Sequence, residues 1–80
     1  MIDVTTSRPL RVSTEGTAGP YIRVPVSQLE EIRLLFEDRE IRHRVQENVI
    51  SLDGGPEIAV IDLGRGADPN AVQAILDSAP

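Results

Sequence analysis

The segment at residues 57–63 constrains the fold of this chain more than any other part of the sequence. Its residues are Glu57, Ile58, Ala59, Val60, Ile61, Asp62 and Leu63, and turn-forming residues stand on both sides, at 53–56 and 64–67. A short apolar run that is rich in β-branched residues and bounded by turns favours a β-strand. Because the apolar side chains fall on both faces of such a strand, we expect it to be buried on much of both faces.

Residues 27–38 have the period of an amphipathic helix. Ser27 and Glu30 fit a capping box, in which each of two side chains bonds to the backbone amide of the other residue. Apolar residues then recur at three- and four-residue spacing; these are Leu29, Ile32, Leu35 and Phe36. Leu34 points away from that apolar face, so we expect it to be exposed or to be covered by another element.

The first helix is predicted to end near Asp38 or Arg39. Glu40 then takes the position where a helix often closes with glycine, and Ile41 folds back as the hydrophobic contact after the cap. A second helix is predicted to begin at Asp68 and Pro69, as N-cap and first helical residue. Its apolar positions follow the helical spacing; they are Val72, Ile75, Leu76 and Ala79.

The remaining chain predicts strands. Residues 10–13 and 21–26 alternate apolar and polar side chains around a turn-rich segment, which indicates a hairpin. Leu10 and Val12 would share a core face with Ile22, Val24 and Val26, and Pro25 would end the strand or mark an edge. A polar extended stretch at 42–48 continues into 49–52, and the turn at 53–56 leads to 57–63.

These elements predict an α+β fold, a two-layer sandwich of order ββαββα, with two helices on one face of a mostly antiparallel sheet. We expect residues 1–8 to form a flexible N-terminal arm and residues 9–80 to form a single domain. If both helices cover one face, then one set of side chains from 57–63 looks outward. The outward set is either Ile58 and Val60, or Ala59, Ile61 and Leu63.

The pattern from Tyr21 onward resembles the small bacterial signal-transducing domains of unknown function, which are ferredoxin-like without the last strand. The residues that carry this resemblance are Leu34-Leu35, Ile41, the hairpin around Asp53-Gly54-Gly55 and the helix from Val72 to Leu76. The chain departs from the pattern at Glu40, where glycine is usual, and in its additional N-terminal hairpin. The topology is also similar to that of ACT domains, although their glycine-bearing turn is missing at Pro25-Val26-Ser27. The resemblance implies a fold and assigns no functional residue.

Composition excludes several chemistries. The 80 residues contain no cysteine and one histidine, so disulfides, thiolate metal sites and thiol catalysis are absent and a multi-histidine metal site cannot form. Lysine is absent too, which removes Schiff-base and phosphate-loop lysines. A net charge of -5 and a single Tyr, a single Phe and no Trp argue against nucleic-acid and membrane partners. We therefore expect no catalytic residue, no cofactor and no metal.

Four groups of residues are candidate contact surfaces. The first is the outward face of 57–63, where Ala59, Ile61 and Leu63 are the larger set. The second is the acidic helix face with Glu30, Glu31, Glu37 and Leu34. The third is Arg42 and Arg44, which could grip a carboxylate or phosphate, or could pair locally with Glu37, Glu40 or Glu57. The fourth is Arg65 and Gly66, a possible anion site before a helix start, although Asp68 would repel an anion there.

His43 lies between Arg42 and Arg44, and we interpret it as a surface or packing residue because no orienting partner is evident. The leading functional hypothesis is a non-catalytic protein-interaction or regulatory module that binds a protein partner or forms a homodimer. Two alternatives stay open: an immunity-like or antitoxin-like inhibitor of a basic partner, and an ACT-like small-molecule sensor. The start of the chain lacks signal-peptide features, so we expect a cytoplasmic location.

Overall fold

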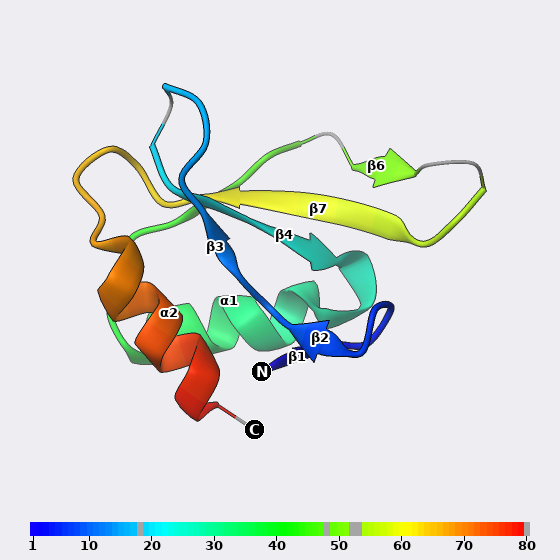
Figure 1. The fold of residues 1–80 in the computed structure, drawn as a ribbon, viewed down its shortest axis with the longest axis horizontal. Helices are drawn as coiled ribbons and strands as arrows, with labels where there is room; N and C mark the ends of the chain where they lie inside the picture. The colour runs from blue at the N-terminus through cyan, green and yellow to red at the C-terminus, as the bar shows by residue number, and fades with distance from the viewer. Residues whose placement is uncertain (18, 48, 52–53, 80) are drawn as a thin grey trace.

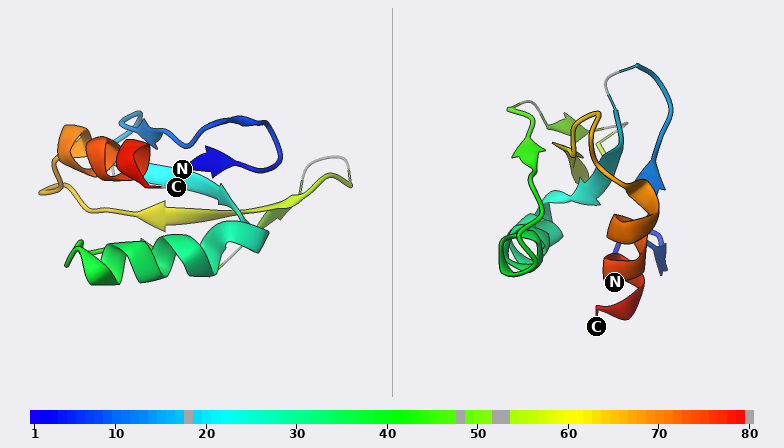
Figure 2. Two further views of the ribbon diagram at one scale, coloured as in Figure 1. Left: turned by 90° about the horizontal axis from the view of Figure 1, so that it is seen from below. Right: turned by 90° about the vertical axis from the view of Figure 1, so that its left-hand side faces the viewer.

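The computed structural model describes the whole chain except residues 18, 48, 52–53 and 80. It has the predicted α+β architecture, with two helices on one face of an antiparallel sheet (Figures 1 and 2). The strands are β1 (Ile2–Asp3), β2 (Arg8–Pro9), β3 (Val12–Ser13), β4 (Tyr21–Pro25), β5 (Arg44–Val45), β6 (Ile50–Ser51) and β7 (Glu57–Asp62). The helices are a 3-10 turn η1 (Val26–Gln28), α1 (Leu29–Asp38) and α2 (Pro69–Ser78).

The main sheet has the order β3-β4-β7-β5, with β6 also paired to β7, and every pairing is antiparallel. The order β4-β7-β5 is the one that a ferredoxin-like arrangement of residues 21–79 requires. The edge place beside β4, which the last strand of that arrangement would fill, is taken by β3 from the beginning of the chain. The N-terminal hairpin therefore joins the main sheet.

The two faces of β7 are both largely buried, as its composition predicts. Ala59, Ile61 and Leu63 lie in the core under the helices, together with Ile32, Phe36, Val72 and Leu76. An outward position for these three residues is therefore wrong. The reason is the register with β4, which pairs Ile22 with Ile61 and Val24 with Ala59, so the apolar side chains of both strands share one face. Val60 is on the opposite face and is only 8 % exposed.

The start of α1 differs from the prediction. Ser27 and Glu30 form no capping box, because the 3-10 turn η1 begins directly after Pro25 and Gln28 stands at the N-cap position of α1. The chain turns away from the sheet there, so Val26 is 38 % exposed and does not reach the core. The apolar face of α1 is as predicted: Ile32 and Phe36 are buried, Leu29 and Leu35 are partly buried, and Leu34 is 56 % exposed.

The predicted end of α1 and the predicted start of α2 are both present. Glu40 has a φ of 58°, and the amides of Glu40 and Ile41 donate to the carbonyls of Glu37 and Phe36 at 3.2 and 2.8 Å. This is the Schellman arrangement, with a glutamate in the left-handed position that favours glycine. At the other helix, the carboxylate of Asp68 accepts from the amides of Asn70 and Ala71 at 3.0 and 3.3 Å.

The segment expected as a flexible arm forms a small two-stranded sheet, β1 with β2. The amide of Leu10 donates to the carbonyl of Met1 at 3.0 Å and extends this pairing. The amino group of Met1 donates to the carbonyl of Leu76 and, at 3.2 Å, to that of Ala79. The beginning of the chain is thus bonded to the end of α2, and the two termini lie close together (Figure 2).

Two glutamine side chains pair with strand edges. The amide of Gln73 on α2 accepts from Val12 N–H at 2.8 Å and donates to the Leu10 carbonyl at 2.9 Å. The buried Gln28 makes the same pair of bonds to β1, accepting from Val4 N–H at 2.9 Å and donating to the Ile2 carbonyl at 2.7 Å. Each side chain thereby occupies backbone groups that an unpaired edge would leave open.

We expect Glu40→Gly to stabilise the protein by about 0.5–1 kcal/mol, because glycine adopts a positive φ without steric cost. The matched control is Glu37→Gly, on the exposed side of α1, which should destabilise by about 1 kcal/mol since glycine is unfavourable inside a helix. Urea denaturation of both variants measures the two effects. Equal destabilisation by both substitutions would contradict the role assigned to Glu40.

We expect Gln73→Ala to destabilise the protein by about 1–3 kcal/mol, because Val12 N–H and the Leu10 carbonyl lose their partners. Gln46→Ala is the control: among the described residues its side-chain amide bonds only to the Asp62 carboxylate, in a solvent-exposed contact, so the loss should stay within about 0.5 kcal/mol. The measurement is again the free energy of unfolding in urea. An effect of Gln73→Ala no larger than that of the control would show that the edge does not depend on this side chain.

Candidate interaction site

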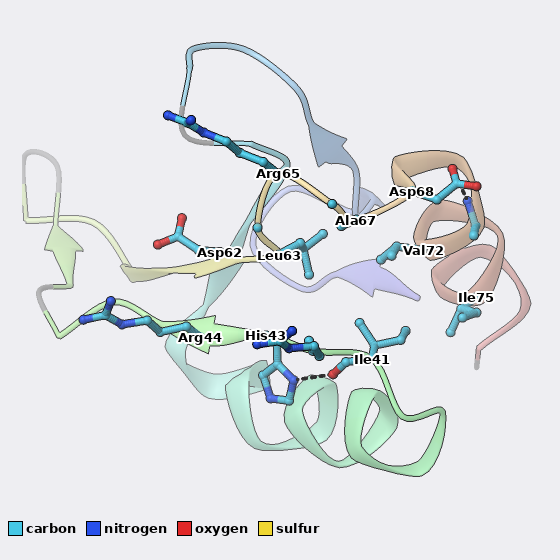
Figure 3. Close-up of a pocket in the computed structure, with 14 residues that line it drawn as sticks. Ile41, His43, Arg44, Asp62, Leu63, Arg65, Ala67, Asp68, Val72 and Ile75 are labelled. Atoms are coloured by element: carbon cyan, nitrogen blue, oxygen red, sulfur yellow. Dashed lines mark hydrogen bonds between the residues drawn. The ribbon is translucent and has the colours of Figure 1, made fainter.

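A groove of about 890 Å³ lies between α2 and the segment that follows α1, at one end of the sheet (Figure 3). It opens where the pairing of β5 with β7 stops, after Arg44 opposite Asp62, so that the chain segments beyond this pair diverge. Residues 41–44 form one wall, residues 62–68 form the end of the groove, and Ala71, Val72 and Ile75 of α2 form the other wall. The groove brings together residues that the sequence places in separate candidate surfaces, namely Arg42, Arg44, Arg65 and Gly66.

The ring of His43 packs against its neighbours and is not directed into the groove. Its ring packs edge-on against Phe36, with 5.4 Å between the ring centroids. Its Nδ1 lies 2.9 Å from the Ile41 carbonyl, a contact that fits a proton on Nδ1. Figure 3 shows the ring directed toward α1 and away from Val72 and Ile75. This geometry is that of a packing histidine.

Arg65 is directed away from the groove, toward the turn that follows β3 (Figure 3). Its Nε donates to the Thr17 carbonyl at 3.0 Å. The two loops touch at Gly19, where an added Cβ would lie 2.8 Å from the Arg65 backbone nitrogen. Because Asp68 already caps the nearby helix start, Arg65 and Gly66 do not converge on an anion-binding geometry. Arg65 instead holds two loops together.

Arg42 and Arg44 make no ion pair among the residues that the structure describes; the two ion pairs found there are Arg33–Glu30 at 3.8 Å and Arg39–Asp38 at 3.5 Å. The predicted local pairing with Glu37, Glu40 or Glu57 is therefore not seen. Asp62 stands directly across from Arg44, but its two carboxylate oxygens accept from Gln46 Nε2 at 3.2 and 3.1 Å. Both guanidinium groups are exposed and available to a partner.

The backbone of β5 is open on its outer side. The amide of Gln46 donates to the Val60 carbonyl at 2.9 Å. In an antiparallel ladder the bonded residues alternate, so the N–H and C=O of Val45 turn away from β7. No strand lies beyond β5 in the described part of the sheet. The β5 edge, by which we mean the backbone of Val45 with the side chains of Arg42 and Arg44, is thus an unpaired strand edge bearing two cations.

The acidic face of α1 is exposed as predicted, with Glu30, Glu31, Glu37 and Asp38 around the exposed Leu34. Only Glu30 and Asp38 take part in ion pairs among the described residues, each with an arginine of the same segment. An acidic helix face is by itself a solvated surface, so it defines no site.

No metal-binding cluster of three or more His, Cys, Asp or Glu side chains occurs among the described residues. Over the same residues, neither helix is long and apolar enough to cross a membrane. Comparisons with protein-family models, curated proteins and solved structures find no match to this chain.

The sequence predicts Arg42 and Arg44 as a contact surface, but it does not predict that β5 is an unpaired strand at the edge of the sheet. The contrast between the two sheet edges depends on Gln73, which lies 61 residues from the strand residue it bonds. A glutamine within a predicted amphipathic helix carries no local pattern that reports such a contact. The position of β5 at the margin of the sheet likewise follows from pairing between distant segments.

Proposed function

We propose that this protein is a non-catalytic protein-interaction module that contacts its partner through the β5 edge. The observation that carries the proposal is the difference between the two sheet edges. Gln73 bonds to backbone groups at the β3 edge, whereas no described residue bonds to the outward backbone groups of Val45, and Arg42 and Arg44 precede it in the chain. Proteins usually block exposed strand edges, because an open edge pairs with other chains. An edge left open beside one that is closed supports a binding role.

The side chains at this edge support the same role. Arginine is the cation most suited to interfaces, since its planar group binds a carboxylate through two parallel hydrogen bonds and is weakly hydrated. Arg42 and Arg44 have no ion-pair partner among the described residues that would have to be displaced. The fold supports the site from beneath, because Val45 packs against the core and His43 packs on Phe36.

Site-specific photo-crosslinking in the native cell tests the proposal. A benzophenone amino acid placed at Gln46, whose exposed side chain lies next to Val45 and whose replacement keeps both arginines, should yield covalent adducts with another protein. The same probe at Arg11, an exposed arginine beside the β3 edge, is the control and should yield none. Adducts that form at Arg11 and not at Gln46 would contradict a role for the β5 edge.

A second candidate function is a small-molecule sensor, and the groove is the observation that favours it. Its volume of about 890 Å³ is in the range of ligand sites, and the walls include apolar side chains from α2 and from residue 41. The groove is also lined by Gly64 and Gly66, in the loop that leads to α2, and by Asp62 and Asp68. These features suit a ligand with an apolar part and one polar group.

Thermal unfolding in the presence of free amino acids and nucleotides tests this candidate. A ligand at a hundredfold excess over its Kd should add about 2.7 kcal/mol to the free energy of unfolding. Ala71→Phe fills the groove from an exposed position and should abolish that stabilisation, whereas Ala74→Phe, exposed on α2 outside the groove, should not. A screen without any stabilising compound would eliminate the sensor hypothesis.

A further inference from the structure

We infer that the partner segment of the β5 edge is an acidic, extended peptide that adds to the sheet as a further strand. This inference rests on the proposed interaction function and names the chemistry of the partner. It combines three observations: an open backbone edge, two arginines without ion-pair partners among the described residues, and an interruption that limits the length of the edge.

The backbone supplies the attachment points. Val45 offers an outward N–H and an outward C=O, which is the pattern that an incoming strand requires. In strand addition the main-chain hydrogen bonds provide affinity, and the alternating side chains provide specificity. At the β3 edge, Val12 N–H and the Leu10 carbonyl are already bonded to Gln73, so a peptide cannot use these two groups without displacing that side chain.

The interruption between β5 and β6 sets the length of the docked segment. Five residue steps separate Val45 from Ile50, whereas only three separate their partners on β7, Ile61 and Ile58. Regular pairing with β7 is therefore interrupted after Gln46 and resumes only at Ile50. A docked peptide is confined to the stretch near residues 42–46, with room for about four to five residues at roughly 3.3 Å each.

The two faces of β5 determine which kinds of side chain the docked peptide should carry on each of its own faces. Val45 is on the helix side and packs on the core, whereas Arg44 and Gln46 are on the opposite side. Carboxylates of a neighbouring strand on that side would meet Arg44, and Arg42 lies exposed two residues earlier. Asp62 is on the far side of Arg44 and is bonded to Gln46, so it does not neutralise Arg44 directly. Alternating acidic and apolar residues match this pattern.

A second copy of the chain is the less suitable occupant. Pairing β5 with β5 would place Arg42 and Arg44 of both copies along one seam, which repels. The net charge of -5 on each copy adds a general repulsion. An acidic segment replaces the local repulsion between arginines with attraction, because each carboxylate meets a guanidinium group.

The probe is a capped heptapeptide that alternates valine and glutamate, titrated into the full-length, isotopically labelled protein. Binding should shift the amide resonance of Val45 and slow its hydrogen exchange. A matched peptide with lysine in place of glutamate should bind at least tenfold more weakly, and so should the glutamate peptide with N-methyl groups on alternate residues. The double variant Arg42→Glu/Arg44→Glu should also lose at least tenfold in affinity.

The control variant Arg8→Glu/Arg11→Glu makes the same charge change beside the closed edge and should keep the Kd within twofold. Thermal unfolding establishes that both double variants are folded. Equal binding of the lysine peptide, resonance shifts confined to α1 or to the groove, or no binding by either peptide would overturn the inference. So would sedimentation as a dimer with Val45 protected in the absence of peptide.

These outcomes are distinct from failure of the proposed function. If the β5 edge binds a partner of another chemistry, the photo-crosslink at Gln46 still forms while the acidic peptide fails. If the edge binds no protein in the cell, the crosslink is absent whatever the peptide does. The two experiments thus separate the existence of the site from the nature of its occupant.

Discussion

The pairing of β4 with β7 is the interaction on which the rest of the structure depends. Five residue pairs align the two strands, from Tyr21 opposite Asp62 to Pro25 opposite Ile58. This register places the apolar side chains of both strands under the helices, and it directs the backbone groups of Ile58, Val60 and Asp62 toward β5 and β6. The core, the face that the helices cover and the margin of the sheet all follow from one alignment.

A sheet built around two central strands in a chain of 80 residues has little material to cover its edges. At the β3 edge the solution is a side-chain amide, since the carbonyl and NH₂ of glutamine reproduce the acceptor and donor of a neighbouring strand. Gln73 on α2 bonds to the β3 edge in this way, and Gln28 in the turn before α1 makes the same pair of bonds beside β1. No such side chain lies beside Val45 among the described residues. The β5 edge is therefore open because of the side chains that the sequence places near it, and the fold itself does not require an open edge.

The sequence predicts the parts of this fold that depend on near neighbours. The period of Ile32 and Phe36, the cap at Asp68 and the turn at Glu40 are each fixed within a few residues, and each is present in the structure. The capping box at Ser27 was equally plausible locally, yet the 3-10 turn after Pro25 replaces it. The outward face of β7 was undecidable from alternation alone, because both sets of side chains are apolar and only the register with β4 separates them. The glutamine contacts and the open edge depend on residues far apart in the chain, which no local pattern encodes.

The charge distribution explains how such a site can be selective. The molecule carries a net charge of -5, and four of its 13 acidic residues lie on the outer face of α1, so its long-range field repels an acidic partner. At the β5 edge, attraction to such a partner comes from Arg42 and Arg44, at distances where paired hydrogen bonds form. Salt screens the long-range repulsion over a Debye length of about 8–10 Å and weakens close charge-assisted contacts much less. An acidic segment of the kind that we propose would therefore associate without steering and be retained by contact, and its recognition would depend on the fit of backbone and side chains at the β5 edge.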